Sequence, residues 1–188
     1  MSAAGLDVPT ALACARAAAG RVTDPELPML TLADLGVLRE VRIGEYGVEV
    51  AITPTYTGCP ALAMMRADLV HELRAAGFAQ VTVRIDLSVP WTTDHISERG
   101  KAALRDHGIS APGPVGSPSA SSGSVSGSGT VTLSGATCLT LGPVRRVVTC
   151  PRCGSERTEV VSEFGATACK ALYRCQDCLE PFEHVKEI

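Results

Sequence analysis

The hydrophobic positions of the first 112 residues predict a small domain of mixed helix and strand. In three segments apolar and polar residues alternate, which is typical of strands with one buried face, and a Gly-Glu-Tyr-Gly turn joins the first two segments as a hairpin. In another segment apolar residues recur every three or four positions, which is typical of a helix with one buried stripe. The predicted strands cover 37–43, 48–53 and 81–88, and the predicted helices cover 10–19, 60–76 and 97–107.

The order of these elements after the first helix is ββαβα. Because each predicted strand is apolar on one side only, we expect a small sheet whose single buried face is covered by helices. The fold class predicted for this part is therefore α+β, with two layers.

A change in composition predicts a linker after this domain. No Asp, Glu, Lys or Arg occurs from His107 to Val144, and sixteen of the 23 residues from Gly113 to Gly135 are Gly, Ser or Pro. Such a segment buries too little apolar surface to offset its ordering entropy. We therefore expect a domain over 1–112, a flexible linker over 113–144 and a second domain over 145–188.

Charge and composition limit the classes of function. The 188 residues carry a formal net charge of −3, and the second domain has seven basic and seven acidic residues, so neither a nucleic-acid binder nor a binder of anionic membranes is expected. No apolar run is long enough to span a bilayer, and the Ala-rich start lacks the basic leader of a signal peptide. We expect a soluble, cytoplasmic protein.

Two Cys-x-x-Cys pairs in the last 39 residues predict a metal site. The pairs are Cys150 with Cys153 and Cys175 with Cys178, separated by 21 residues. Two thiolates three positions apart in a tight turn can reach one ion, and two such turns complete a tetrahedron. This is the pattern of a zinc ribbon, and zinc would stabilise a domain with few large apolar residues. A rubredoxin-type iron site and a redox dithiol are the alternatives.

Two further residues lie close to these pairs. Cys169 could act as a ligand, face a cluster or pack as a small buried residue, and the packing role is the one expected. His184 follows the second pair, but four cysteines already fill a tetrahedron, so a surface histidine is expected.

Cys59 is the candidate reactive residue of the first domain. It lies between a predicted strand and a predicted helix, in Thr57-Gly58-Cys59-Pro60, and proline favours the first helical position. Cys59 would then lie at or beside the N-cap, where the helix dipole lowers the pKa of a thiol and makes it a nucleophile or a ligand for a soft metal. A buried, inert thiol is the equally weighted alternative.

Several acidic and aromatic residues have more ordinary explanations. Asp24, Glu26 and Asp34 could act as paired acids or bind a metal, but caps of turns are expected. Trp91 is expected to anchor the chain, and His95 is either a ligand or a polar loop residue.

The motifs Asp24-Pro-Glu-Leu-Pro28, Asp34-Leu-Gly36 and Thr57-Gly-Cys-Pro60 resemble the SufT-like family of iron–sulfur assembly proteins. With Trp91-Thr-Thr-Asp94 and the segment from Phe164 to Cys175, the chain resembles the PaaD (PaaJ) family, encoded with bacterial phenylacetyl-CoA epoxidases. His95 and the long linker depart from the family pattern.

The resemblance implies a SufT-like domain joined to a zinc ribbon and an accessory role in phenylacetate catabolism. It implies that Cys59 is the reactive cysteine, a ligand for a transient iron–sulfur cluster, and that Cys169 belongs to the C-terminal motif. The zinc ligands would be Cys150, Cys153, Cys175 and Cys178.

The implied task is maturation of the epoxidase, by delivery of an iron–sulfur cluster or iron to its reductase or its di-iron subunit. Since a cluster needs about four ligands, a carrier with Cys59 would form a homodimer, borrow a small thiol or recruit Cys169. The alternative is a non-catalytic docking subunit of the same complex with an inert Cys59. Catalysis by the chain itself is not expected.

Overall fold

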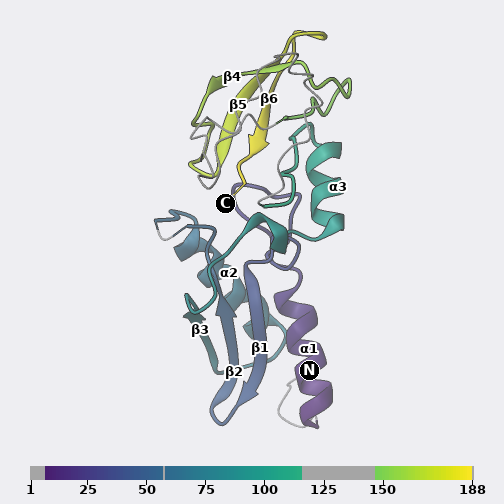
Figure 1. Cartoon of the computed structure of the whole chain (residues 1–188). Coiled ribbons are helices and arrows are strands. Elements are labelled where there is room, and N and C mark those ends of the chain that lie inside the picture. Colours follow the sequence, from purple (N-terminus) through teal and green to yellow (C-terminus); the bar gives the residue numbers. More distant parts are fainter. Residues whose placement is uncertain (1–6, 57, 116–146, 188) are drawn as a thin grey trace, which may run out of the picture.

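The computed structural model describes residues 7–56, 58–115 and 147–187. They form an N-terminal module and a C-terminal ribbon stacked end to end (Figure 1). In chain order the elements of the N-terminal module are α1 (Val8–Ala19), β1 (Leu38–Gly44), β2 (Gly47–Ile52), α2 (Leu62–Ala75), β3 (Val81–Ile85), the short 3-10 helix η1 (Thr93–His95) and α3 (Glu98–Asp106). Those of the ribbon are β4 (Thr158–Ser162), β5 (Lys170–Cys175) and β6 (Pro181–Val185).

The N-terminal sheet has the order β1-β2-β3, with an antiparallel hairpin and a parallel third strand. Helices α1 and α2 pack against each other, and α1 packs against β1 and α2 against β3 (Figure 1). The buried stripe of α2 consists of Met65, Leu69 and Leu73, at the spacing that the sequence predicts. The α+β class with a separate C-terminal sheet is therefore confirmed.

Two elements differ from the sequence prediction. Strand β3 ends at Ile85 rather than at Ser88, because both the backbone N–H and the hydroxyl of Ser88 donate to Asp86 Oδ1 and form a turn. The last helix forms as α3 but does not cover the sheet; it lies on the loop before β1, close to the ribbon (Figure 1). Gly100 allows this approach, since a Cβ there would lie 3.1 Å from the carbonyl oxygen of Asp34.

The ribbon is an antiparallel sheet of order β4-β5-β6. Its own buried cluster is small and consists of Val148, Cys150, Cys175 and Phe182, with Tyr173 packed against it. The predicted linker over 113–144 lies outside the described residues from 116 onward.

The ribbon is joined to the N-terminal module through its last strand. The N–H of Ser110 donates to the carbonyl oxygen of Glu183 at 2.8 Å, and the N–H of Val185 donates to the carbonyl oxygen of Ser110 at 3.1 Å. Val185 is buried in the core of the N-terminal module. The two parts therefore share backbone hydrogen bonds and one continuous apolar contact.

Candidate metal centre and thiol site

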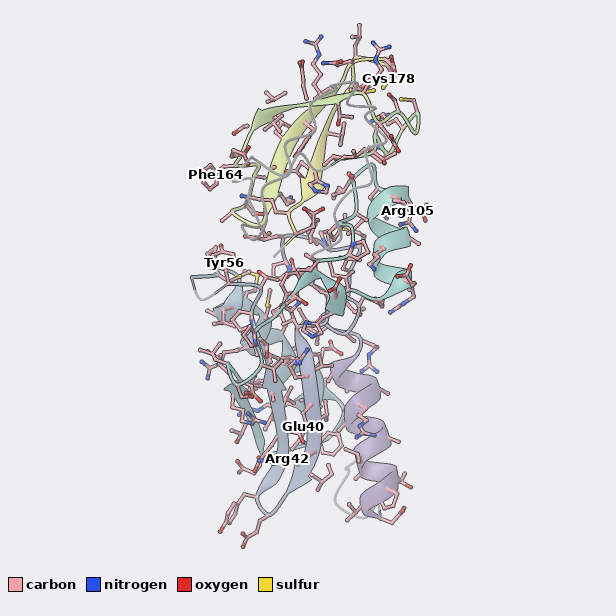
Figure 2. The ribbon with its side chains drawn as sticks, in the orientation of Figure 1. Glu40, Arg42, Tyr56, Arg105, Phe164 and Cys178 are labelled. Carbon is pink, nitrogen blue, oxygen red and sulfur yellow. The ribbon has the colours of Figure 1, made fainter. Side chains whose placement is uncertain are left out.

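The four cysteines of the two Cys-x-x-Cys pairs lie together at the end of the ribbon farthest from the N-terminal module (Figure 2). Their sulfur atoms all lie within 4.8 Å of one another, with Cys150 Sγ 3.8 Å from Cys178 Sγ and Cys153 Sγ 3.5 Å from Cys175 Sγ. Metal–sulfur bonds of about 2.3 Å in a tetrahedron separate the sulfurs by about 3.8 Å. The arrangement therefore matches the geometry of one tetrahedral ion.

The same local backbone shapes both turns. The residue after each pair has a positive φ, +74° at Gly154 and +63° at Leu179. The N–H of Gly154 donates to the carbonyl oxygen of Cys150 at 3.0 Å, and in the second turn the N–H of Asp177 donates to Cys175 Sγ at 3.4 Å. The first bond closes the turn of the Cys150 pair, and the second places a donor on one sulfur of the Cys175 pair.

The protonation of these thiols is uneven. Backbone N–H donors from Cys178 and Asp177 lower the pKa of Cys175 to about 6. At Cys153 the N–H of Ser155 acts in the same direction, but contacts with the other thiols, Cys175 foremost, raise its pKa to about 12. Four thiols this close together become fully deprotonated only when a bound cation compensates the negative charge of the thiolates. The four cysteines form a metal-binding site of soft thiolate donors.

His184 is buried, which corrects the prediction of a surface histidine. It is 3% exposed, with Nδ1 3.2 Å from the hydroxyl of Ser110 and Nε2 3.6 Å from a carboxylate oxygen of Glu187. Its ring also meets Tyr173 edge-on, with centroids 5.5 Å apart. The histidine lies at the junction between the two parts because β6 pairs there with Ser110.

Cys59 is half-buried and packs against the core of the N-terminal module. Helix α2 has Ala61 as its N-cap, so Cys59 lies two residues before the cap instead of at or beside it. Desolvation raises the pKa of the Cys59 thiol above its ordinary value, and the N–H of Ala61 opposes this only in part. The prediction of a lowered pKa is therefore wrong for the metal-free chain.

Two carboxylates of the N-terminal module and one thiol of the ribbon act electrostatically on Cys59. The carboxylates of Glu26 and Asp24 and the thiol of Cys169 each raise the pKa of Cys59 further. Burial raises the pKa of Cys169, and Glu26 adds to that shift while the Lys170 ammonium opposes it. The structure thus brings Cys59 and Cys169 into one electrostatic environment beside Glu26, although 110 positions of sequence separate the two cysteines.

The residues next to Cys169 hold it at this junction. The hydroxyl of Thr167 lies 3.0 Å from Cys169 Sγ, and the carbonyl oxygen of Cys169 accepts a hydrogen bond from the N–H of Lys186. The buried Lys170 ammonium is paired with Glu183 at 2.8 Å. Tyr56 and Phe164 lie on the same side of the junction (Figure 2).

Cys59, Cys169 and Glu26 are not a preassembled metal site. Among the described residues, the four-cysteine cluster is the only group of three or more Cys, His, Asp or Glu residues whose ligand atoms all lie within 4.8 Å of one another. An ion or cluster held by Cys59 and Cys169 would need further ligands from outside this group, or a small closure of the ribbon onto the N-terminal module.

The other predicted acids have structural roles. Asp24 Oδ1 accepts the N–H groups of Glu26 and Leu27, both at 2.8 Å, which makes it the expected cap of a turn. Asp34 accepts hydrogen bonds from the hydroxyls of Thr31 and Ser97 and from both nitrogens of the Arg99 fork. Together these donors outweigh desolvation and lower the pKa of Asp34.

The segment around the single tryptophan is also structural. The ring of Trp91 is buried and its Nε1–H donates to the carbonyl oxygen of Leu35 at 2.9 Å, as expected of an anchor. His95 Nδ1 accepts the N–H of Thr92 and closes the turn of η1. Gly36 passes directly beneath it, with φ +72° and no room for a Cβ, which would lie 2.5 Å from the Cβ of His95.

Comparison with known proteins agrees with both parts of this arrangement. Residues 135–186 match the family model described as the PaaD zinc beta ribbon domain, and residues 13–85 match the model described as iron-sulfur cluster assembly protein. The chain is 39% identical over 167 residues to a protein of Escherichia coli K12, covering 88% of this chain and 87% of the relative. The chain belongs to the PaaD family.

The Escherichia coli member of the PaaD family is provisionally named as one of the subunits of 1,2-phenylacetyl-CoA epoxidase. Two solved structures also resemble part of this chain. A DUF59 domain from Bacillus anthracis is 25% identical, with a TM-score of 0.46, and covers 50% of this chain and 90% of its own. A conserved hypothetical protein from Thermotoga maritima is 26% identical, with a TM-score of 0.42, and covers 49% and 91%.

In this PaaD family member, no helix of the described residues is long and apolar enough to cross a bilayer. The sequence does not predict the influence of Glu26 on Cys59 and Cys169, that of Lys170 on Cys169, or the pairing of Ser110 with the ribbon. For Glu26, the only indication in the sequence is its place in the Asp24-Pro-Glu26 motif. Ser110 and Lys170 carry no local pattern, because their importance depends on how the ribbon docks.

Proposed function

We propose that this chain is an accessory subunit of a phenylacetyl-CoA epoxidase and helps to mature that oxygenase by delivering an iron–sulfur cluster or iron. Membership of the PaaD family supports the association with the epoxidase, and the match of residues 13–85 supports work on iron–sulfur clusters. The recipient is the reductase or the di-iron subunit. The protein works in the cytoplasm, where thiols stay reduced.

The observation that carries this proposal is that Cys59 and Cys169, from the two parts of the molecule, lie within electrostatic reach of each other and of Glu26 at the junction. Two thiolates and a carboxylate are donors for iron, and a bound cation offsets the desolvation and the nearby negative charge that keep both thiols protonated in the metal-free chain. Because a cluster needs about four ligands, the remaining positions are filled by a small thiol or by a second copy of the chain. An incomplete protein ligand set suits a cargo that must leave.

Delivery is a ligand exchange and needs no net oxidation or reduction. When the cluster binds, the thiols of Cys59 and Cys169 release their protons. When ligands of the recipient replace them, both thiols take up protons again. Their raised pKa values favour this return to the protonated form.

We further propose that the ion at Cys150, Cys153, Cys175 and Cys178 is zinc and that it is structural. Four cysteines close the tetrahedron and leave no open position for chemistry. The ribbon's own buried cluster is small, so an ion that joins both turns supplies much of its stability.

Anaerobic reconstitution tests the cargo. Wild type, Cys59→Ala, Cys169→Ala and the control Cys14→Ala, whose cysteine is exposed on α1, are incubated with iron and sulfide and then analysed for zinc, iron and sulfide. We expect zinc in all four, and iron and sulfide in wild type and Cys14→Ala only. Iron and sulfide bound equally by Cys59→Ala would refute the carrier function.

A docking subunit with an inert Cys59 is the second candidate. The half-buried and protonated Cys59 favours it, since such a thiol is a poor nucleophile. This candidate predicts zinc alone in every variant, together with stoichiometric binding to the epoxidase that does not change in Cys59→Ala.

A further inference from the structure

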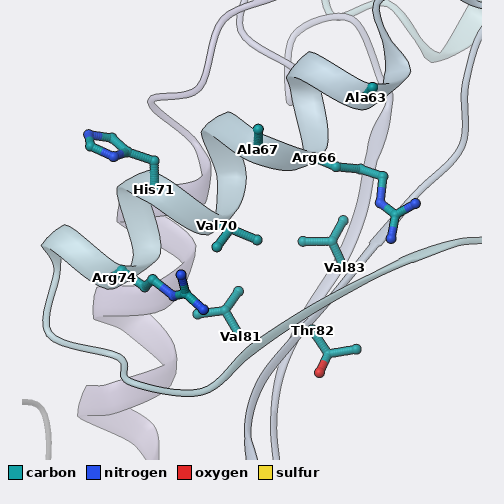
Figure 3. A pocket seen from close by; sticks show the side chains of 9 residues that line it. All are labelled: Ala63, Arg66, Ala67, Val70, His71, Arg74, Val81, Thr82 and Val83. Carbon is teal, nitrogen blue, oxygen red and sulfur yellow. The ribbon is translucent and has the colours of Figure 1, made fainter.

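A groove of about 720 Å³ runs between α2 and β3 on the N-terminal module (Figure 3). Helix α2 contributes Arg66, Val70 and Arg74, and β3 contributes Val81, Thr82 and Val83. Figure 3 shows both guanidinium groups extended from the helix toward the strand, with the three valines between them. The groove therefore has an apolar floor with a cation at each end.

Neither guanidinium is neutralised within the part of the chain that the structure describes. Arg66 and Arg74 are exposed and take part in no ion pair there, unlike Arg84, which pairs with Glu40 and Asp86. Two unpaired cations beside one groove attract a ligand with two negative charges.

The groove also borders a free sheet edge. Strand β3 is the last strand in the order β1-β2-β3, and in the described structure no strand pairs with its outer side. Val81 and Val83 face α2 while the intervening Thr82 is exposed, so a groove lined by all three residues follows the strand edge itself. Such an edge offers backbone N–H and C=O groups to an added strand.

The spacing of the two arginines matches an extended ligand. Arg74 lies eight positions after Arg66, which is about 12 Å along the helix axis, and a rise of four positions along a strand is about 13 Å. In a strand, positions i, i+2 and i+4 lie on one face. Carboxylates at i and i+4 would therefore meet the two arginines while an apolar side chain at i+2 covers the valines.

We propose that this groove binds an acidic, extended segment of a partner protein, added to the sheet as a fourth strand beside β3. The proposal does not rest on the carriage of a cluster by Cys59. The residues of this chain that the structure does not describe contain no Asp or Glu, so none of them supplies the required carboxylates. Because Ala63 at the end of the groove is in the first turn of α2, the bound segment would hold the partner near Cys59.

The test uses the full, isotopically labelled chain and the blocked heptapeptide Thr-Glu-Thr-Val-Thr-Glu-Thr, followed by nuclear magnetic resonance. We expect saturable shifts at the amides of Val81, Thr82 and Val83, with affinity that falls as salt rises. In Arg66→Glu/Arg74→Glu the affinity falls roughly tenfold or more. In the control Arg105→Glu, an exposed arginine on α3, it stays within about twofold of wild type.

Two control peptides separate the parts of the proposal. Replacing both glutamates by glutamine removes the charge, and replacing the central valine by proline removes a backbone donor needed for pairing. Both changes are expected to weaken binding.

Four results would overturn the proposal. They are no saturable shift at millimolar peptide, shifts centred elsewhere, equal binding of the glutamine or proline peptide, and self-association of the free chain that Arg66→Glu/Arg74→Glu abolishes. The last result would make a second copy of this chain the occupant.

Discussion

Replacing Cys178 by serine tests whether the ribbon depends on its metal. The side chain of Cys178 is exposed, so exchanging its sulfur for oxygen removes one ligand and almost no packing. Any large loss of structure would then come from the ion. Cys14→Ser, an equally conservative change at an exposed cysteine on α1, is the matched control.

The size of the effect follows from the ribbon's contents. Among its buried cluster only Val148 and Phe182 are ordinary apolar side chains, and their burial contributes about 1.5–3 kcal/mol each, or about 3–6 kcal/mol together. A structural zinc ion contributes about 10–16 kcal/mol in comparable small domains. The ion is the larger contribution, so we expect the ribbon of Cys178→Ser to unfold.

Unfolding of the ribbon has a measurable effect on the N-terminal module. Val185 then no longer packs in the core of that module, which lowers the module's free energy of unfolding by about 1.5–3 kcal/mol. At about 4–8 °C per kcal/mol for a domain of this size, the Tm of the N-terminal module falls by roughly 6–24 °C. Cys14→Ser is expected to keep its zinc and its Tm.

Metal analysis, amide spectra of the labelled chain and thermal unfolding together check this prediction. We expect loss of zinc, collapse of the dispersed amide signals of 147–187 and the lower Tm. A variant that lacks zinc but keeps dispersed ribbon signals and the wild-type Tm would refute the reasoning, because the ribbon would then fold on its apolar contacts alone.

Three further predictions concern the N-terminal module. Gly36→Ala lowers the free energy of unfolding by at least about 2 kcal/mol, because this position has a positive φ and the added Cβ also meets His95. Gly108 has a similar φ of +75° but open space around an added Cβ, so in Gly108→Ala the free energy of unfolding falls by only about 1 kcal/mol in denaturant titrations. Asp34→Asn lowers the free energy of unfolding by about 1–3 kcal/mol at pH 7. The extra stability of the wild type is fully present above the unfolded pKa of about 3.9 and is lost as the pH falls through the lowered pKa of folded Asp34. Equal unfolding curves for the two proteins at pH 7 would contradict this prediction. Glu26→Gln lowers the pKa of Cys59 in the metal-free chain, which the pH dependence of alkylation measures; an unchanged profile would show that the carboxylate is too distant to act.

Much of the fold is predictable because its signals are local. The alternation of apolar residues gives the three N-terminal strands, the stripe on α2 gives its buried face, and the two Cys-x-x-Cys pairs place four sulfurs around one point. Each of these signals depends on residues only a few positions apart.

The remainder depends on docking, for which the chain has no short-range signal. The burial of His184 follows from the pairing of Ser110 with β6, between residues 74 positions apart, and the position of α3 follows from its contacts with Asp34, more than 60 positions earlier. The pKa of Cys59 was predicted in the wrong direction for the same reason. Desolvation and the carboxylates of another loop raise the pKa of Cys59 by more than the N-terminus of α2, capped two residues later at Ala61, can lower it.

The insertion of Val185 into the N-terminal core makes the two ends of the molecule thermodynamically reciprocal. An ion at the four cysteines favours the ordered ribbon, and the ordered ribbon keeps Cys169 within electrostatic reach of Cys59. Any cargo that binds across those two thiols must then tighten the hold on the distant ion by the same factor by which that ion tightens the hold on the cargo. Under the proposed function, the metal content of the four cysteines therefore sets the affinity of Cys59 and Cys169 for their cargo.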